Sequence, residues 1–164
     1  MSASITGIRL PADRDRPPEA VTFDPSDLAL MQGVVGGYLE AVELGEPAGT
    51  AYVNKDGLQL RLPVNPRVTL LARAATPARR AHVLVGNALL VGPVDADGRD
   101  TSVPEGYRAV LLDGPDRVRV ELVSEGGRRR WPVKGSWSNP FVALATGLEL
   151  ARECPEAALR VLPA

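Results

Sequence analysis

The stretch VRVELVSEGGRRRWPV, residues 118–133, decides the fold class of this 164-residue chain, because a glycine turn divides two segments of strand character. In the first segment, valine and leucine alternate with Arg119 and Glu121, which is the two-residue period of a half-buried β-strand. The Ser-Glu-Gly-Gly segment at 124–127 has the residue types of a chain reversal. We therefore predict an antiparallel hairpin whose second strand covers residues 128–133.

Helix starts are marked by an Asx residue followed by proline, ahead of apolar residues at helical spacing. The Asx side chain caps the first turn, and proline at the first helical position loses no hydrogen bond. We predict helices that end at the glycine pair 36–37, near residue 74 and near residue 153, where Cys154-Pro155 follows. The three starting pairs are Asp24-Pro25, Asn65-Pro66 and Asn139-Pro140.

Between the helices the apolar residues follow a period of two. Leu58 to Leu62 alternates with polar residues just after Asn54-Lys55-Asp56-Gly57, a sequence typical of tight hairpin turns, so we predict that residues 50–53 and 58–62 pair. Helices interspersed with hairpins predict an α+β fold with a mixed or antiparallel sheet and three helices. Further strands are expected at residues 5–10, 20–23, 38–44 and 83–94.

The chain has the usual length of a single domain, with one weak joint at Leu112-Asp113-Gly114-Pro115-Asp116. We expect a main α+β unit over residues 1–112 and a β-β-α tail over residues 113–164. Because about fifty residues bury little apolar surface, we expect the tail to pack on the main unit rather than to be independent.

Metal and cofactor sites find little support in the composition. A single histidine, His82, and a single cysteine, Cys154, exclude a Cys/His zinc cluster and an intrachain disulfide. His82 lies in an apolar segment that we interpret as a strand, which disfavours a catalytic triad. Residues 95–100 have prolines where an EF-hand needs its end ligands, and residues 33–37 lack the Lys-Ser/Thr of a phosphate loop. We expect no metal and no cofactor, and the sequence favours a non-enzymatic protein.

Charge and hydropathy restrict the partners. A net charge of −1 provides no global attraction to nucleic acid or to an anionic membrane. We find no signal-like N-terminus and no apolar run of membrane-spanning length, so we expect a cytoplasmic protein with no membrane partner. Lys55 and Lys134 are the only lysines among nineteen basic residues, a bias that favours a GC-rich, actinobacterial genome.

Several segments of the main unit together resemble a known family. They are residues 31–40 (MQGVVGGYLE), 53–57 (VNKDG), 62–65 (LPVN), 85–87 (VGN) and 91–92 (VG). In this order they resemble the family catalogued as domain of unknown function 3846, which occurs in bacteria, phages and other mobile elements. The resemblance covers about residues 5–107 and leaves the tail unassigned. It implies no activity, because the family has none established.

Most of these motif positions have a structural explanation as helix ends, turns or caps. Three of them, Gln32, Tyr38 and Glu40, are required by neither a cap nor a turn. A small carboxylate-dependent hydrolase or transferase would use Glu40 with Tyr38 in a cleft. The motif positions of unknown role are Gln32, Gly36, Gly37, Tyr38, Glu40, Asn54, Asn65 and Gly86.

Both tryptophans and four basic residues gather within ten positions just before the third helix. Arginine binds phosphate bidentately and tryptophan stacks on bases, so such a strip is typical of contacts with RNA or single strands. In the alternative interpretation, the arginines are solvated while the tryptophans pack beneath the helix. The candidate binding residues are Arg128, Arg129, Arg130, Trp131, Lys134 and Trp137.

Taken together, these observations favour an accessory or regulatory protein that acts through a protein or nucleic-acid partner. The small hydrolase or transferase remains one alternative. Another is a structural subunit whose apolar C-terminal helix forms a symmetric homodimer.

Overall fold

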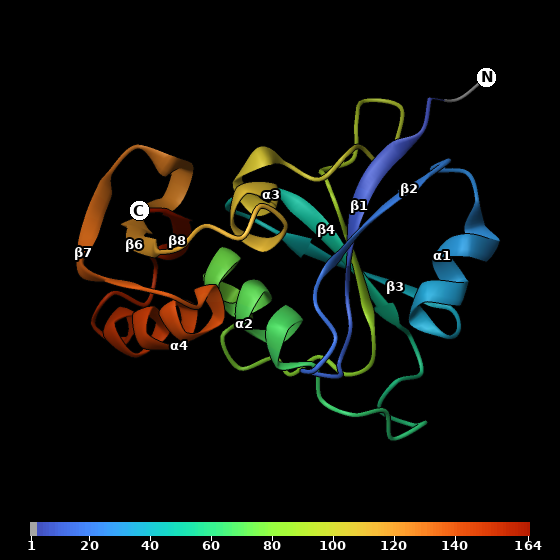
Figure 1. Cartoon of the computed structure of the whole chain (residues 1–164), viewed down its shortest axis with the longest axis horizontal. Helices are drawn as coiled ribbons and strands as arrows, with labels where there is room; N and C mark the ends of the chain where they lie inside the picture. Colours follow the sequence, from blue (N-terminus) through green and yellow to red (C-terminus); the bar gives the residue numbers. More distant parts are fainter. Residues whose placement is uncertain (1–2) are drawn as a thin grey trace.

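The computed structural model describes residues 3–164, which form two antiparallel β-sheets and four α-helices within that range (Figure 1). The class is α+β, as predicted. The large sheet has the strand order β2-β1-β5-β4-β3, and the small sheet has the order β7-β6-β8. The strands are β1 (Ile5–Leu10), β2 (Glu19–Phe23), β3 (Leu39–Leu44), β4 (Gly49–Asn54), β5 (Ala88–Val91), β6 (Val118–Val123), β7 (Arg130–Trp137) and β8 (Ala158–Pro163).

Helices cover both faces of the large sheet. On one face, α1 (Leu28–Val35) buries Met31 and Val34 against Leu89 and Val91 of the central strand β5. On the other face, α2 (Pro66–Ala75) and α3 (Glu105–Leu111) pack on β1, β3 and β4. The sheet is therefore buried from both sides, which explains why β5 carries four consecutive apolar residues rather than an alternating pattern.

Asparagine caps start two helices where the sequence predicts them. Asn65 accepts a hydrogen bond from the backbone N–H of Val68, and Asn139 caps α4 (Pro140–Leu150) in the same manner. The first start was predicted three residues too early. Asp27, not Asp24, caps α1, while Asp24 accepts hydrogen bonds from Ser26 and closes a turn before the helix. Gly36 then ends α1 in a left-handed conformation, as expected.

The small sheet shares one hydrophobic core with the large sheet, and α2 lies between the two (Figure 1). One face of α2 packs on the large sheet, and the helix also contacts β8 and α4. The predicted hairpin at residues 118–133 forms between β6 and β7. The last strand, β8, pairs with β6 on its other side, so residues 113–164 form a β-β-α-β unit rather than the predicted β-β-α tail.

The predicted pairing of residues 50–53 with residues 58–62 is wrong. The β4 strand pairs instead with β3 and β5, and residues 55–61 form consecutive turns. Packing is the reason, because β3 and β5 occupy both edges of β4, and the segment packs instead near Val85, whose Cγ2 would lie 2.7 Å from a Cβ at Gly57. Arg61 even adopts a left-handed φ of 54°, which no strand contains.

Other local predictions also need correction. The helix α3 was not predicted, because it begins at Glu105 after Pro104, which has no capping side chain and so gives no start signal in the sequence. The segment with His82 is an irregular, exposed loop rather than a strand, and the strand predicted over residues 83–94 is confined to β5. The last helix ends at Leu150 and continues only as a short 3-10 turn to Glu153. Among the described residues, no helix is both long and apolar enough to cross a membrane.

Candidate functional site

The small sheet has one covered face and one face rich in arginine. Val120 of β6 and Leu159 of β8 point at α4, where a Cβ on Gly147 would lie 3.2 Å and 3.1 Å from their methyl groups. Because side chains alternate along a strand, Arg119 and Glu121 point to the opposite face. Arg160 of β8 lies directly opposite Glu121 on that face, and Arg130 of β7 lies opposite Val123, one position further along the same face.

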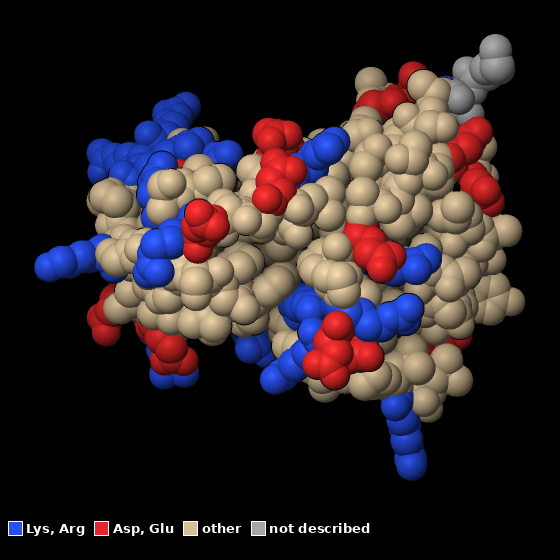
Figure 2. Space-filling view, in the orientation of Figure 1, with Lys and Arg blue, Asp and Glu red and all other residues tan. Residues whose placement is uncertain are grey.

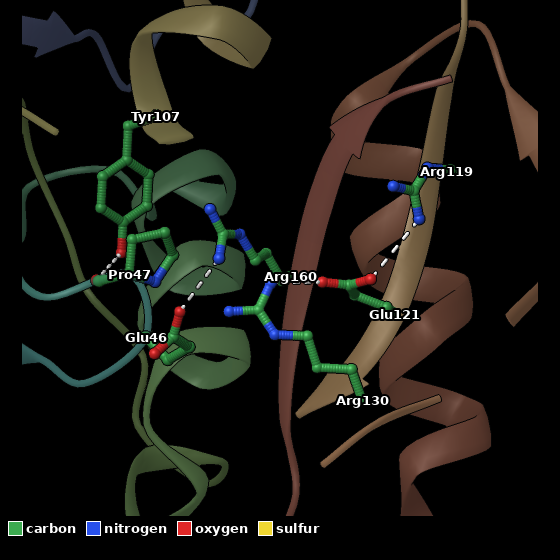
Figure 3. A network of polar contacts seen from close by, with 7 residues as sticks. All are labelled: Glu46, Pro47, Tyr107, Arg119, Glu121, Arg130 and Arg160. Atoms are coloured by element: carbon green, nitrogen blue, oxygen red, sulfur yellow. Dashed lines mark hydrogen bonds and ion pairs between the residues drawn. The ribbon is translucent and has the colours of Figure 1, made fainter. Parts of the chain in front are cut away.

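Glu121 organises these arginines. Its side chain is only 10% exposed, and its carboxylate oxygens lie 3.2 Å from Arg130 Nη1 and 3.4 Å from Arg119 Nη1. Arg160 pairs with Glu46 of the main unit instead, at 3.4 Å between Nη1 and Oε1. Figure 3 shows Glu46 and Glu121 on either side of the Arg160 and Arg130 guanidinium groups. Half-exposed arginines held by a buried carboxylate keep their remaining donors available to an anion.

The turn that leads into β7 extends this positive surface. Ser124 fixes the turn, because its hydroxyl accepts from the Arg129 N–H at 3.0 Å and its own N–H donates to the Arg129 carbonyl at 2.9 Å. Arg128, Arg129 and Lys134 are exposed, and none of the three makes an ion pair within residues 3–164. Figure 2 shows a dense group of basic side chains at this end of the molecule. We name as the basic surface Arg119, Arg128, Arg129, Arg130 and Lys134.

The structure separates the two tryptophans from this basic surface. Trp137 is half-buried and packs against the main hydrophobic core. Trp131 is 46% exposed and borders a cavity of about 480 Å³ whose charged lining is Glu125, Glu153 and Glu156. Trp131 therefore has carboxylates as its charged neighbours, whereas the exposed arginines of the predicted strip lie on the basic surface.

The family-motif positions gather elsewhere, on the main unit. Asn65 is fully buried, and its Nδ2 donates to the carbonyls of Leu10 and Gly86, both at 2.9 Å, while its Oδ1 caps α2 at Val68. One side chain therefore joins β1, α2 and the segment before β5. Sequence reasoning predicted only the cap, because the other two partners are far away in the chain.

Asn54 and two glycines complete this arrangement. Asn54 is buried; its Nδ2 donates to the Val35 carbonyl at 3.3 Å and its Oδ1 accepts from the Asp56 N–H at 2.9 Å. A Cβ at Gly37 would lie 2.8 Å from Asn54 Nδ2, and one at Gly86 would lie 2.8 Å from Leu62 Cδ1. A small cavity of about 230 Å³ remains between them. We name as the asparagine–glycine cluster Gly36, Gly37, Asn54, Asn65 and Gly86.

Gln32, Tyr38 and Glu40 do not converge on a cleft. Tyr38 and Glu40 are exposed, and Gln32 is half-buried on α1, where its carbonyl accepts from the N–H groups of Gly36 and Gly37. None of the three side chains lines a cavity described here. The carboxylate active site at Glu40 stays a prediction, with Tyr38 and Glu40 both on the exposed surface.

Sequence reasoning missed two partly buried contacts at the junction of the sheets. The Tyr107 hydroxyl donates to the Pro47 carbonyl at 2.6 Å, and burial raises the pKa of Tyr107 above its usual range (Figure 3). Glu46 and Arg160 pair across 114 positions. No local pattern relates residues so far apart, and only the packing of β8 against the main unit brings them together.

Metal-binding groups do not assemble in the described part of the chain. Within residues 3–164, no three or more His, Cys, Asp or Glu side chains lie close enough to hold a metal ion. In the segment that was compared with an EF-hand, Asp95 accepts hydrogen bonds from the N–H groups of Asp97 and Arg99.

Comparison with known proteins identifies the main unit alone. No curated protein and no solved structure matches the chain. The family described as a domain of unknown function (DUF3846) matches residues 5–112, slightly beyond the 5–107 expected from the motifs. The match contains the whole asparagine–glycine cluster and ends before the basic surface begins. Because it covers about two thirds of the chain, the protein belongs to the domain of unknown function 3846 family.

Proposed function

We propose that the protein is a non-enzymatic accessory or regulatory protein of the cytoplasm that binds nucleic acid through the basic surface. The observation that carries this proposal is the exposure of five cations on one sheet face and its turn, with Glu121 as their one carboxylate partner among residues 3–164. Phosphate groups are the anions that arginine forks hold best, because two parallel N–H donors match two oxygens.

The mode of binding follows from what surrounds the cations. Trp131 lies among glutamates, which supports contacts with the sugar-phosphate backbone rather than with stacked bases. We therefore expect weak dependence on sequence and strong dependence on salt. Each phosphate contact made by an arginine releases counterions and adds about 0.7–0.9 to the slope of log affinity against log salt.

The test is fluorescence anisotropy with labelled single- and double-stranded DNA and RNA at several salt concentrations. Replacing Arg128 and Arg130 with alanine should lower the affinity about tenfold or more and reduce the salt slope. Arg14→Ala with Arg16→Ala is the matched control, because both arginines are exposed on a distant loop and the net charge changes equally. Absence of binding, or equal losses in both double variants, would rule out the nucleic-acid function.

A symmetric homodimer is the second candidate, and one observation favours it. On the side of α4 turned away from the core, Val142 and Leu150 are about half exposed. An unpaired apolar helix face of this kind is typical of a helix–helix contact. Light scattering tests this candidate: a concentration-dependent doubling of mass that Val142→Glu removes would support it, and a monomer at all concentrations would exclude it.

A further inference from the structure

An apolar groove with an acidic rim passes around the end of the small sheet. It consists of two cavities, of about 660 Å³ and 480 Å³, which share Ser124, Glu125, Pro155 and Glu156 in their linings. The larger cavity lies between the β6–β7 turn and the segment that follows α2, and the smaller one lies beside Trp131. We name this feature the acidic groove.

Every charged side chain that lines the groove is a carboxylate. Glu46 is already paired with Arg160, but Glu125, Glu153 and Glu156 make no ion pair within the described residues. Most of the remaining lining is small and apolar, including Val123, Ala158 and the Pro77-Ala78 pair that follows α2. An apolar floor with unpaired anions at its rim is complementary to a chain that alternates apolar and cationic groups.

Trp131 adds a second element that favours a cation. Its side chain is about half exposed and lines the smaller cavity together with Glu153 and Glu156. A guanidinium or ammonium group over an indole face gains cation–π attraction, and nearby carboxylates add ion pairing. The ring has no cation above it within the described residues, where Arg67 over Phe141 is the cation–π pair found.

The groove wall is held in place before any ligand binds. Arg80 donates to the carbonyls of Pro155 and Ala157, which ties the segment after α4 to the main unit. These contacts use the Arg80 guanidinium for backbone carbonyls, and burial lowers its pKa. A wall that is already ordered costs little conformational entropy on binding.

We propose that the acidic groove binds an extended peptide segment of a partner protein that carries arginine or lysine side chains. Carboxylates at the rim take the cationic heads, Trp131 takes one of them face-on, and the apolar floor takes the backbone and alkyl stems. This site is separate from the proposed nucleic-acid site, and removal of nearby arginines should change the two binding affinities in opposite directions. Arg128 and Arg129 adjoin the groove through the same turn, so their removal weakens phosphate binding and strengthens binding of a basic peptide.

The experiment uses the full chain and a fluorescein-labelled peptide, (Arg-Ala)4, with (Glu-Ala)4 as the negative probe, followed by anisotropy. Replacing Glu125, Glu153 and Glu156 with glutamine should weaken binding of (Arg-Ala)4 about tenfold, and Trp131→Leu should weaken it about threefold. The matched control replaces the exposed Glu40, Glu43 and Glu105 with glutamine, which changes the net charge equally outside the groove. Thermal unfolding of each variant confirms that it is folded.

Saturable binding that the groove variant weakens and the control variant preserves supports the proposal, as does a rise in affinity for Arg128→Ala with Arg129→Ala. Equal losses in the groove and control variants would show attraction to the whole molecule and overturn it. The proposal also fails if (Arg-Ala)4 does not bind at millimolar concentration, or if spermine binds more tightly than the peptide, since the groove then takes a free polyamine. Light scattering in parallel excludes the case in which the turn of a second copy already fills the groove.

Discussion

The asparagine–glycine cluster and the basic surface differ in whether their polar side chains have partners within the chain. In the cluster, the Asn54 and Asn65 amides are buried and every hydrogen bond goes to the chain itself. On the basic surface, Arg128, Arg129 and Lys134 face solvent without an ion-pair partner in residues 3–164. The most recognisable sequence pattern of this protein thus stabilises its fold, while the surface that we propose for binding is the one where charged groups have no partner in the chain.

Substitution of Asn65 should give the largest effect. Asn65→Ala removes the α2 cap and leaves the buried carbonyls of Leu10 and Gly86 without their donor, so we expect a loss of about 3 kcal/mol in the free energy of unfolding. Urea denaturation measures it. Asn139→Ala is the control, since its side chain only caps a helix, and should cost about 1 kcal/mol. Equal losses would break the comparison, because they would mean that the cluster adds nothing beyond a cap.

Two glycines with nearly equal φ angles should show a smaller effect of substitution, and comparing them separates packing from backbone conformation. Gly86 has φ +78° and would place a Cβ 2.8 Å from Leu62, whereas Gly98 has φ +77° and open space. Gly86→Ala should therefore cost about 2–3 kcal/mol, and Gly98→Ala about 1 kcal/mol from backbone conformation alone. The difference between their urea midpoints measures the packing of the cluster. A difference near zero would show that Leu62 moves aside freely.

Substitution of Glu121 tests the basic surface and should have the smallest effect on the free energy of unfolding. Glu121→Gln removes the carboxylate that Arg119 and Arg130 share, at a cost of about 1 kcal/mol because both arginines are half exposed. At the same time, affinity for nucleic acid should rise roughly two- to threefold, since the arginines lose a competing anion. Anisotropy titration checks the rise, with Glu43→Gln on β3 as a control of equal charge. Unchanged affinity in Glu121→Gln would place the phosphate contacts away from the sheet face.

The helices and strands that could be predicted correctly from the sequence are those marked by a local signal. Asn65 and Asn139 mark helix starts because a capping side chain acts within three residues, and the β6–β7 hairpin follows from alternation and a glycine turn. The start of α1 was misplaced because Asp24 and Asp27 are both able to cap, and proline after Asp24 favoured the wrong one. A local pattern can identify both possible caps, but it does not determine which one starts the helix.

Long-range packing decided what the sequence could not. Leu58 to Leu62 alternates like a strand, but the edge that it would pair with is occupied by β3 and β5, so the segment forms turns instead. The candidate cations were found because they are adjacent in the chain. The acidic groove was not, because Glu46, Glu125 and Glu156 come from three segments that meet only after β8 has paired with β6.

The position of α2 between the two sheets limits how this architecture can vary. Its Leu71 and Ala75 line the junction with α4 and β8, where apolar side chains from both halves leave almost no free space. A chain that stopped at Leu112, where the family match ends, would expose this side of the helix to water. Any protein that uses the family fold alone must therefore shield α2 with something else, such as a different appended segment or another subunit. In this protein residues 113–164 cover α2 and also carry the basic surface. The segment that completes the hydrophobic core is therefore also the one on which we propose a binding site.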